Sequence, residues 1–193
     1  MKLLLYCSKA KPYLFKRGNQ IKDRFDTDYF LFDKVWEDTK DNALNGKIVG
    51  ECDFEVEEIN IIFAFHNLIG LYDTDTLTDT QLEEKSCLSF DELKKYLGDK
   101  YGYAIHIKNL TIYDTPKELS DFTHTTTSYN GARLKALLQK APQNMMYAYG
   151  NYERYVLISI QPQWLGRILN GEKTIEVRRK VLKEMLQNDG SRN

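Results

Sequence analysis

Cysteine is scarce in this sequence, and its few copies lie far apart. The 193 residues contain Cys7, Cys52 and Cys87, and no two of them have the C-x-x-C spacing. An odd number of widely spaced cysteines argues against a disulfide framework and against a zinc site built on cysteine. We therefore expect a protein of the reducing cytoplasm, with no metal ion and no other cofactor.

Long apolar runs are also missing. The first run, at residues 2–7, ends at Ser8 and Lys9, and it is too short for the core of a signal peptide or for a membrane span. The sequence further lacks a glycine-rich phosphate loop, a G-x-S-x-G motif, an H-E-x-x-H motif and an internal repeat. The common signatures of phosphate-loop proteins, serine hydrolases and zinc peptidases are thus absent, and we expect no membrane partner.

Charge of one sign does not dominate the chain. The 27 basic and 28 acidic residues give a formal net charge of −1, so no global field attracts long nucleic acid. The balance is uneven, because residues 150–193 contain 8 Lys and Arg against 5 Asp and Glu, and residues 1–149 contain 19 against 23. This asymmetry fits contact with one nucleotide or a short strand better than binding along a duplex.

Length and composition fit one globular domain. Hydrophobic residues make up 42% of the chain and charged residues 28%, which is the ordinary balance of a soluble protein with a real core. We expect a single domain over residues 1–180, with an elaborated loop insertion at residues 13–45. A short helical or disordered tail is expected at residues 181–193.

Hydrophobic periodicity predicts an α+β protein with many strands and a few short helices. A capping box formed by Ser89 and Glu92 predicts a helix at residues 89–98, and propensity predicts another at residues 132–140. Strands are expected at residues 2–7, 46–58, 61–71, 101–113 and 144–149. The remaining expectations are a second capping box at residues 115–118, polar loops at residues 72–80 and 121–131, and a short helical tail at residues 180–187.

The most informative stretch, residues 156–180, has the pattern of a strand, a helix and a second strand. Pro162 suits the first position of a helix, and the apolar residues after it fall on one helical face. Gly171 is placed to end that helix, and residues 173–178 then alternate as a strand does.

Two charged residues of this second strand would lie side by side. On a regular strand Glu176 and Arg178 share one face, whereas Lys173 lies on the other. One interpretation is a solvated face that carries a weak ion pair, since exposed ion pairs are common and contribute little energy. The other interpretation is a functional site, and the spacing alone leaves both open.

The order of residues around this pair resembles a known family. Gly171, Lys173, Glu176 and Arg178 match the G-x-K-x-x-E-x-R signature of the ASCH domain, and the strand and helix before them match its context. ASCH domains belong to the PUA-like superfamily of small β-barrels, which bind RNA or modified bases. The resemblance implies a mixed β-barrel with short peripheral helices and with the strand–helix–strand signature unit at the C-terminus.

The resemblance extends to residues 46–51, 87–121 and 141–143, which are similar to later parts of phage-type ASCH proteins. In those relatives the signature unit comes first, whereas here it comes last, so the chain resembles a circularly permuted ASCH domain, phage or prophage encoded. A truncated second copy, or a dimer that completes a partner's barrel by strand exchange, is the alternative. One closed, permuted barrel is favoured because it leaves fewer unpaired strand edges.

The family implies a pocket for RNA or for a modified nucleotide or nucleoside. Arg178 would bind a phosphate or a base edge, Lys173 would supply a point charge, and Glu176 would accept a hydrogen bond from an exocyclic amine. Three further residues, among them a tryptophan that would stack on the base, are expected near the mouth: Ser159, Gln161 and Trp164.

Histidines add one more candidate. His66, His106 and His124 do not have the spacing of metal ligands. His106 lies on a predicted strand, where a lone histidine is more often structural, but its titration range would suit a pocket.

Two other functions stay open. Some small ASCH proteins are amidohydrolases that act on acetylated cytidine with a Lys, a Thr and a Glu. Lys173 matches that Lys, Glu176 stands in the Thr position, and the distant Glu has no exact match. In such a hydrolase Lys173 and Glu176 would be catalytic, as base or nucleophile and as proton carrier. The second alternative is a phage factor that binds a host protein.

Overall fold

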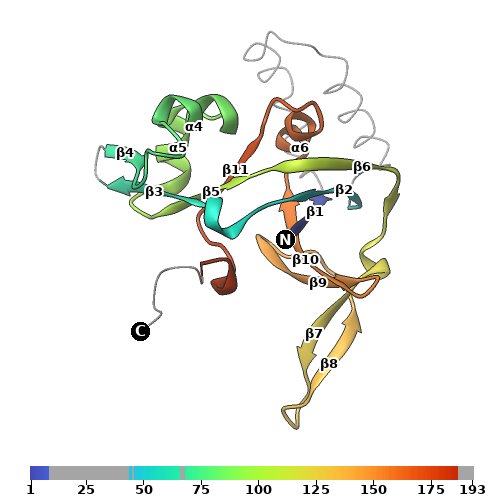
Figure 1. Cartoon of the computed structure of the whole chain (residues 1–193). Coiled ribbons are helices and arrows are strands. Elements are labelled where there is room, and N and C mark those ends of the chain that lie inside the picture. The colour runs from blue at the N-terminus through green and yellow to red at the C-terminus, as the bar shows by residue number, and fades with distance from the viewer. Residues whose placement is uncertain (9–43, 45, 66–67, 187–193) are drawn as a thin grey trace.

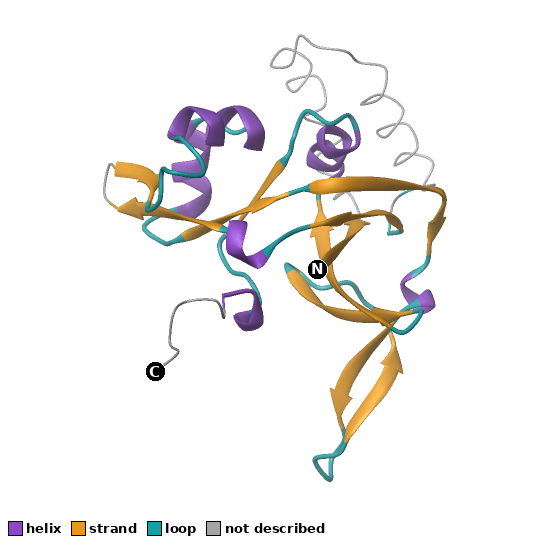
Figure 2. Ribbon diagram, viewed as in Figure 1, coloured by secondary structure: helices purple, strands orange, loops and turns teal. Residues whose placement is uncertain are grey.

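The described part of the chain folds into two β-sheets with three short α-helices beside them (Figure 1). The computed structural model describes residues 1–8, 44, 46–65 and 68–186. Within these residues the predicted α+β class is confirmed, with strands predominating (Figure 2). The described strands form one seven-stranded and one four-stranded sheet, whose pairing does not close into a barrel. The PUA-like barrel therefore stays a prediction.

The larger sheet is built around two adjacent parallel strands, β1 (Lys2–Cys7) and β10 (Glu153–Ile160). Leu3, Leu4 and Leu5 are all fully buried, because a central strand covered on both faces presents every side chain to a core. The other neighbours in this sheet pair antiparallel. Its order is β6 (Lys108–Lys117), β2 (Ile48–Asp53), β1, β10, β9 (Met145–Gly150), β7 (Thr123–Thr127) and β8 (Arg133–Leu137).

Two helices cover one face of the smaller sheet. Its order is β11 (Ile175–Arg178), β5 (Gly102–His106), β3 (Asn60–Phe65) and β4 (Leu68–Leu71). The helices α4 (Asp79–Ser86) and α5 (Phe90–Leu97) lie beside this sheet in Figure 1. Ile62, Leu82 and Val177 belong to the buried core between the helices and the strands.

A second core joins the two sheets. The helix α6 (Pro162–Leu169) contributes Leu165 and Ile168 to it. Ile105 of β5 and Val156 of β10 belong to the same buried cluster. The strands β10 and β11, which precede and follow α6, therefore lie where the two sheets meet.

The helix α5 begins at the capping box that the sequence predicts. The Ser89 hydroxyl accepts from the backbone N–H of Glu92, and the Glu92 carboxylate accepts from the N–H of Ser89. We expect Ser89→Ala to lower the free energy of unfolding by about 1 kcal/mol, because the first turn loses the acceptor for a backbone N–H. Urea unfolding measures this, with Ser89→Asp as a control that still caps. An alanine variant as stable as the wild type would contradict the prediction.

Three predicted strands are longer than the strands observed. The sequence predicts one strand over residues 101–113, but the chain forms β5 and β6 there, in different sheets. Asn109, just after the break, has a φ of 48°, a left-handed conformation that asparagine tolerates. Residues 61–71 contain the antiparallel strands β3 and β4 instead of one strand, and His66 lies outside the described residues. The strand expected at residues 46–58 is the shorter β2, followed by a 3-10 turn, η1 (Val56–Glu58).

The predicted helix at residues 132–140 is wrong. This stretch contains β8, which pairs with β7, and β7 lies within the predicted loop at residues 121–131. Helix propensity is a weak preference, and pairing with the β-branched threonines of β7 overrides it. The turn between the strands is closed by the N–H of Ser128, which donates to the carbonyl of Ala132.

The helix α4 begins within a polar stretch that the sequence predicts as a loop. This helix begins at Asp79, inside the predicted loop at residues 72–80, and Thr78 caps it in a second capping box with Gln81. The Thr78 side chain satisfies an N–H of the first turn, so a polar run that resembles a loop also encodes a helix start.

The end of β6 also differs from the prediction. The capping box expected at residues 115–118 lies mostly within β6, and the cap falls at Glu118, before the 3-10 turn η2 (Leu119–Asp121). The tail expected at residues 180–187 contains one 3-10 turn, η3 (Lys183–Leu186). Of the loop insertion expected at residues 13–45, all but Leu44 lies outside the described residues.

Candidate functional site

The strand–helix–strand unit expected near the C-terminus is present and connects the two sheets. In the larger sheet β10 lies between β1 and β9, and in the smaller sheet β11 pairs with β5. Pro162 opens α6, and Gly171, with a φ of 76°, follows its end, as the local signals predict. The N–H of Lys173 donates to the carbonyl of Arg167, which holds the segment between α6 and β11 in place.

Lys173, Glu176 and Arg178 form one charged cluster. The Nζ of Lys173 lies 3.4 Å from Oε2 of Glu176, and the Nε of Arg178 lies 2.8 Å from Oε1 of the same carboxylate. Lys173 also donates to the backbone carbonyl of Ser86, at 2.7 Å. One carboxylate thus contacts two cations, and the three side chains together carry one net positive charge.

The cluster is buried, so the interpretation as a solvated strand face is wrong. The exposed fractions of Lys173, Glu176 and Arg178 are 3%, 7% and 9%. Lys173 precedes β11, so its side chain does not follow the alternation of faces along that strand. This explains why it reaches Glu176. A buried ion pair adds little net stability, because the loss of hydration offsets the attraction. Stability alone therefore does not account for three buried charges at the edge of a sheet.

Arg178 ties the cluster to the larger sheet. Its terminal nitrogens donate to the backbone carbonyl of Ser159, at 2.7 Å, and to Oδ1 of Asn144, at 3.3 Å. The Nε–H is close to Glu176 but not aligned with it, and it has no hydrogen-bond partner among the described residues. Nε is itself buried and lies against the Glu176 carboxylate, so its charge stabilises that carboxylate within the cluster.

Burial sets the protonation of Lys173. Removal from water lowers the pKa of its ammonium group, because desolvation disfavours the charged form. The Glu176 carboxylate raises that pKa and Arg178 lowers it further, and desolvation is the largest of these effects. Lys173 therefore gives up its proton more readily than an exposed lysine does.

An open cleft of about 1090 Å³ lies beside the cluster and is lined by Lys173, Glu176 and Arg178. This volume is slightly larger than that of typical small-molecule sites. Two aromatic rings also line the cleft, and each has a cation over it. The Nζ of Lys173 lies 5.5 Å from the centroid of Trp164, and the guanidinium of Arg179 lies 4.8 Å from that of Tyr96.

Six of the seven residues that the sequence singled out come together at this cleft. Besides the charged cluster, Ser159, Gln161 and Trp164 line it. The Ser159 hydroxyl donates to the carbonyl of Pro142 at 2.6 Å, so its proton is already used within the fold. Gln161 precedes α6 without capping it through its side chain, which leaves its amide exposed at the cleft.

His106 is not among the described residues that line the cleft. Its Nε2 lies 2.8 Å from Oδ1 of Asn60, on the neighbouring strand β3. Burial lowers the pKa of His106, and the Glu58 carboxylate opposes that effect. The geometry is that of a structural histidine that joins two strands.

The sequence did not indicate the second wall of the cleft. Lys95 and Tyr96 of α5 line the cleft, together with Arg179 after β11. The helical pattern at residues 89–98 marks Tyr96 only as an inward-facing position. One signal in the sequence could have indicated Arg179. It directly follows Arg178, so if the side chain of Arg178 points into the cleft, that of Arg179 lies at its rim.

The described residues contain no candidate metal centre and no helix that could span a membrane. No three His, Cys, Asp or Glu side chains there are grouped so that they could hold a metal ion. None of the helices described there has both the length and the apolar character needed to cross a membrane.

Comparisons with protein-family models, with curated proteins and with solved structures found no match for this chain.

Proposed function

We propose that the chain is an ASCH-type, PUA-like module that binds a nucleotide, either free or as part of RNA. The observation that carries the proposal is the buried cluster of Lys173, Glu176 and Arg178 beside an open cleft with aromatic walls. The match to the ASCH signature adds to it, because the three signature side chains are those that meet at the cleft.

The cleft offers a nucleotide three kinds of contact. The rings of Trp164 and Tyr96 provide surfaces on which a flat base can stack. Glu176 can accept from an exocyclic amine, while the guanidinium of Arg178, which also lines the cleft, can donate to a base oxygen or nitrogen. Rim cations, of which Arg179 is one, suit a phosphate. Folding has already removed the cluster from water and fixed its charges in place, so little of the cost of desolvation remains when the ligand binds.

Tryptophan fluorescence tests this assignment directly. The chain has two tryptophans, and Trp36→Phe leaves Trp164 as the only tryptophan, which can be excited selectively over tyrosine. We expect nucleoside monophosphates to quench its emission in a saturable manner, because a stacked base contacts the indole ring. An emission that stays constant over the concentrations at which the same ligand binds by calorimetry would place the ligand elsewhere and refute the assignment.

A hydrolase is the second candidate, and one observation favours it. The lowered pKa of Lys173 beside a carboxylate is the arrangement that a lysine base or nucleophile needs. In that case Lys173 would take a proton from a water molecule that attacks the acetyl carbon, the C–N bond of the amide would break, and Glu176 would pass a proton to the departing amine. Chromatography of acetylcytidine after incubation distinguishes the candidates, because a hydrolase releases cytidine and a binding module returns the ligand unchanged.

A further inference from the structure

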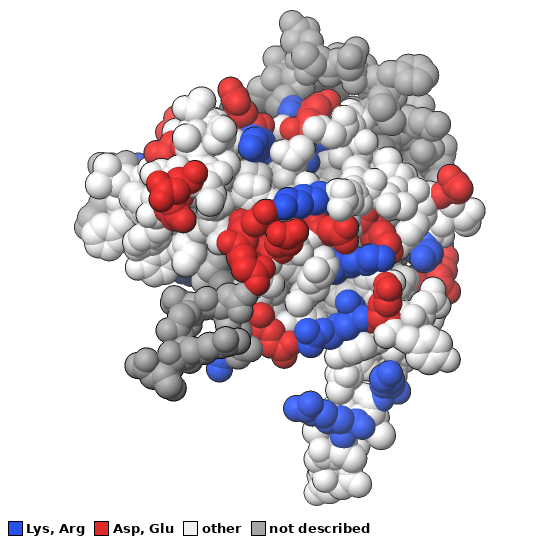
Figure 3. Space-filling view, in the orientation of Figure 1, with Lys and Arg blue, Asp and Glu red and all other residues white. Residues whose placement is uncertain are grey.

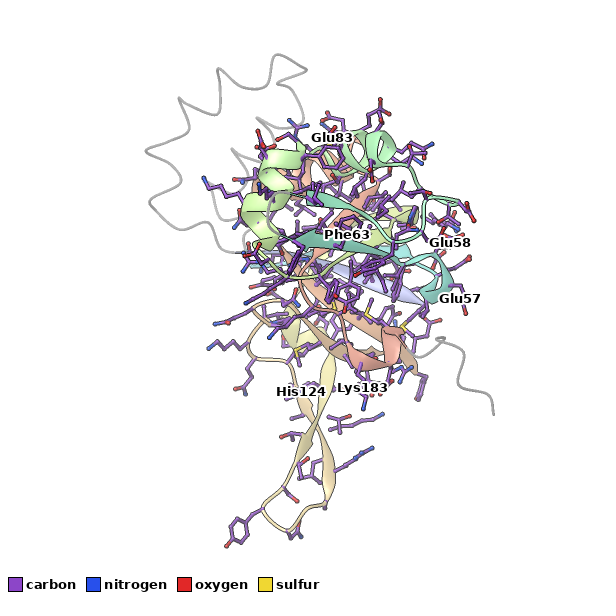
Figure 4. The ribbon with its side chains drawn as sticks, turned by 90° about the vertical axis from the view of Figure 1, so that its left-hand side faces the viewer. Glu57, Glu58, Phe63, Glu83, His124 and Lys183 are labelled. Atoms are coloured by element: carbon purple, nitrogen blue, oxygen red, sulfur yellow. The ribbon has the colours of Figure 1, made fainter. Side chains whose placement is uncertain are left out.

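The hairpin of β7 and β8 projects from the body as an arm, which we define as residues 122–138. Figure 1 shows it extending below the larger sheet, and Figure 4, turned by 90° and with His124 labelled, shows the same projection. β7 pairs with β9 at one position only, Thr123 with Tyr149, whereas β7 and β8 pair along their whole length. An isolated two-stranded hairpin is marginally stable in water, so an arm of this kind gains from a partner that covers it.

The two faces of the arm differ in chemistry. Opposite residues of an antiparallel pair share a face, and alternate residues lie on opposite faces. Register places Leu134 and Ala136 on one face with His124 and Thr126. The other face carries hydroxyl groups and cations, and its members are Thr123, Thr125, Thr127, Arg133, Lys135 and Leu137. Arg133 and Lys135 are both exposed.

No carboxylate opposes these cations on the arm. Residues 122–138 contain no Asp or Glu, and in Figure 3 the arm shows basic side chains without acidic ones, whereas both signs are interspersed over the body. At the base of the arm the Nζ of Lys135 lies 5.5 Å from the ring centroid of Tyr149 on β9. Tyr149 is opposite Arg154 on β10, whose guanidinium forms an ion pair with Glu184 at 2.9 Å. Tyr129, at the turn of the arm, is fully exposed.

We infer that the arm binds the phosphate backbone of a single RNA strand, one nucleotide of which occupies the cleft. Lysine, arginine and threonine side chains are the groups that bind phosphate oxygens, and exposed tyrosines add surfaces for stacking. The inference rests on the proposed function and narrows the ligand from a nucleotide to a single RNA strand. A free nucleotide in the cleft would not contact the arm.

The dimensions give the length of strand required. The cleft is at the carboxyl end of β10, and the arm joins the sheet at the row of Arg154, about 20 Å away at roughly 3.3 Å per residue. The paired part of the arm, from Thr123 to Thr127, adds about 13 Å by the same measure. A single strand that keeps the stacked, helical rise of roughly 3.4 Å per nucleotide needs about ten nucleotides to span this distance. A strand of about four nucleotides in the cleft does not reach the tip.

The test uses three probes and two variants of the full chain. The probes are a nucleoside monophosphate, a single-stranded RNA of about four nucleotides and one of about twelve, long enough to span the estimated distance. The arm variant is Arg133→Gln combined with Lys135→Gln. The matched control is Lys100→Gln, which removes an exposed lysine that is neither on the arm nor among the described residues of the cleft. Binding is measured by fluorescence anisotropy at several salt concentrations, with melting temperature as the check on folding.

We expect the arm variant to bind the longer RNA about tenfold more weakly at low ionic strength. The magnitude of its slope of log K against log salt concentration should fall by about 1.4, which is about 0.7 for each of the two lost phosphate contacts. Binding of the monophosphate and of the short RNA should be unchanged, as should all binding by Lys100→Gln. If the monophosphate binds and the longer RNA is insensitive to the arm, the inference is overturned and the proposed function stands. If the wild type binds none of the probes, both are overturned.

Discussion

Replacement of Glu176 by glutamine is expected to lower the free energy of unfolding by about 3–5 kcal/mol, the usual cost of breaking a buried ion pair. Glu176 contacts both Lys173 and Arg178, and its exposed fraction is 7%. Glutamine keeps the volume but leaves two buried cations next to each other without a counter-charge. Urea unfolding at neutral pH measures the loss.

The matched control is Glu172→Gln. Glu172 belongs to the same segment and is paired with Arg167 at 3.5 Å, but its side chain is 37% exposed. Exposed pairs contribute about 0–1 kcal/mol, so this variant should remain close to the wild type in stability. Equal effects of the two substitutions would show that burial does not determine the energy of the cluster.

The pH dependence of this loss has a definite sign. Burial holds the folded-state pKa of Lys173 below its ordinary value of 10.5, so the unfolded state binds more protons at pH values between the folded pKa and 10.5. Stability therefore rises with pH in that window. Without Glu176 the pKa falls further, and Lys173 becomes neutral at lower pH. The gap in stability between the variant and the wild type should accordingly narrow as pH rises toward 10.5, and a constant gap would count against this explanation.

Replacement of Lys173 by methionine is expected to remove ligand binding while leaving the fold largely intact. Methionine fills a similar volume, and the Glu176–Arg178 pair that remains is neutral. The lost donor to the Ser86 carbonyl is offset in part by removal of a buried charge, so the free energy of unfolding should change by less than about 2 kcal/mol. Lys173 lines the cleft, where we expect its ammonium group to supply a point charge to the ligand. Loss of a buried charged contact of this kind costs about 2–5 kcal/mol, or a factor of about 30 or more in affinity.

Titration calorimetry with a nucleoside monophosphate measures this effect, and Lys100→Met is its control. If Lys173→Met binds as the wild type does, the cleft is not the binding site. Arg178 is less suitable for the same test, because it donates to Ser159 and Asn144 and its removal would also loosen the junction of the sheets.

The elements that the sequence predicts well are those with local causes. β1 follows from an apolar run, α5 from the reciprocal bonds of Ser89 and Glu92, and the limits of α6 from Pro162 and Gly171. Each of these signals acts within a few residues. β8 is the counterexample, because its sequence prefers a helix and only pairing with β7 makes it a strand.

The site shows the same division between local and long-range causes. The spacing places Glu176 beside Arg178, and they are indeed in contact. Their burial depends on packing that no local pattern encodes. Lys173 reaches the carbonyl of Ser86, which is 87 residues away in the chain, and α5 supplies the second wall. Whether an ion pair on a strand is solvated or buried is thus decided by the arrangement of the sheets.

The measurement that tests the central claim most directly is the melting temperature of the wild type and of Lys173→Met with nucleosides, nucleotides and short RNAs, acetylcytidine included. A ligand that binds only the folded state stabilises it by about 2.7 kcal/mol at a hundred times its Kd, which raises the melting temperature by several degrees. The account predicts such a rise in the wild type, little or none in the variant, and ligand recovered unchanged by chromatography. Equal rises in both proteins, or no rise with any ligand, would contradict it, and recovery of deacetylated ligand would favour the hydrolase.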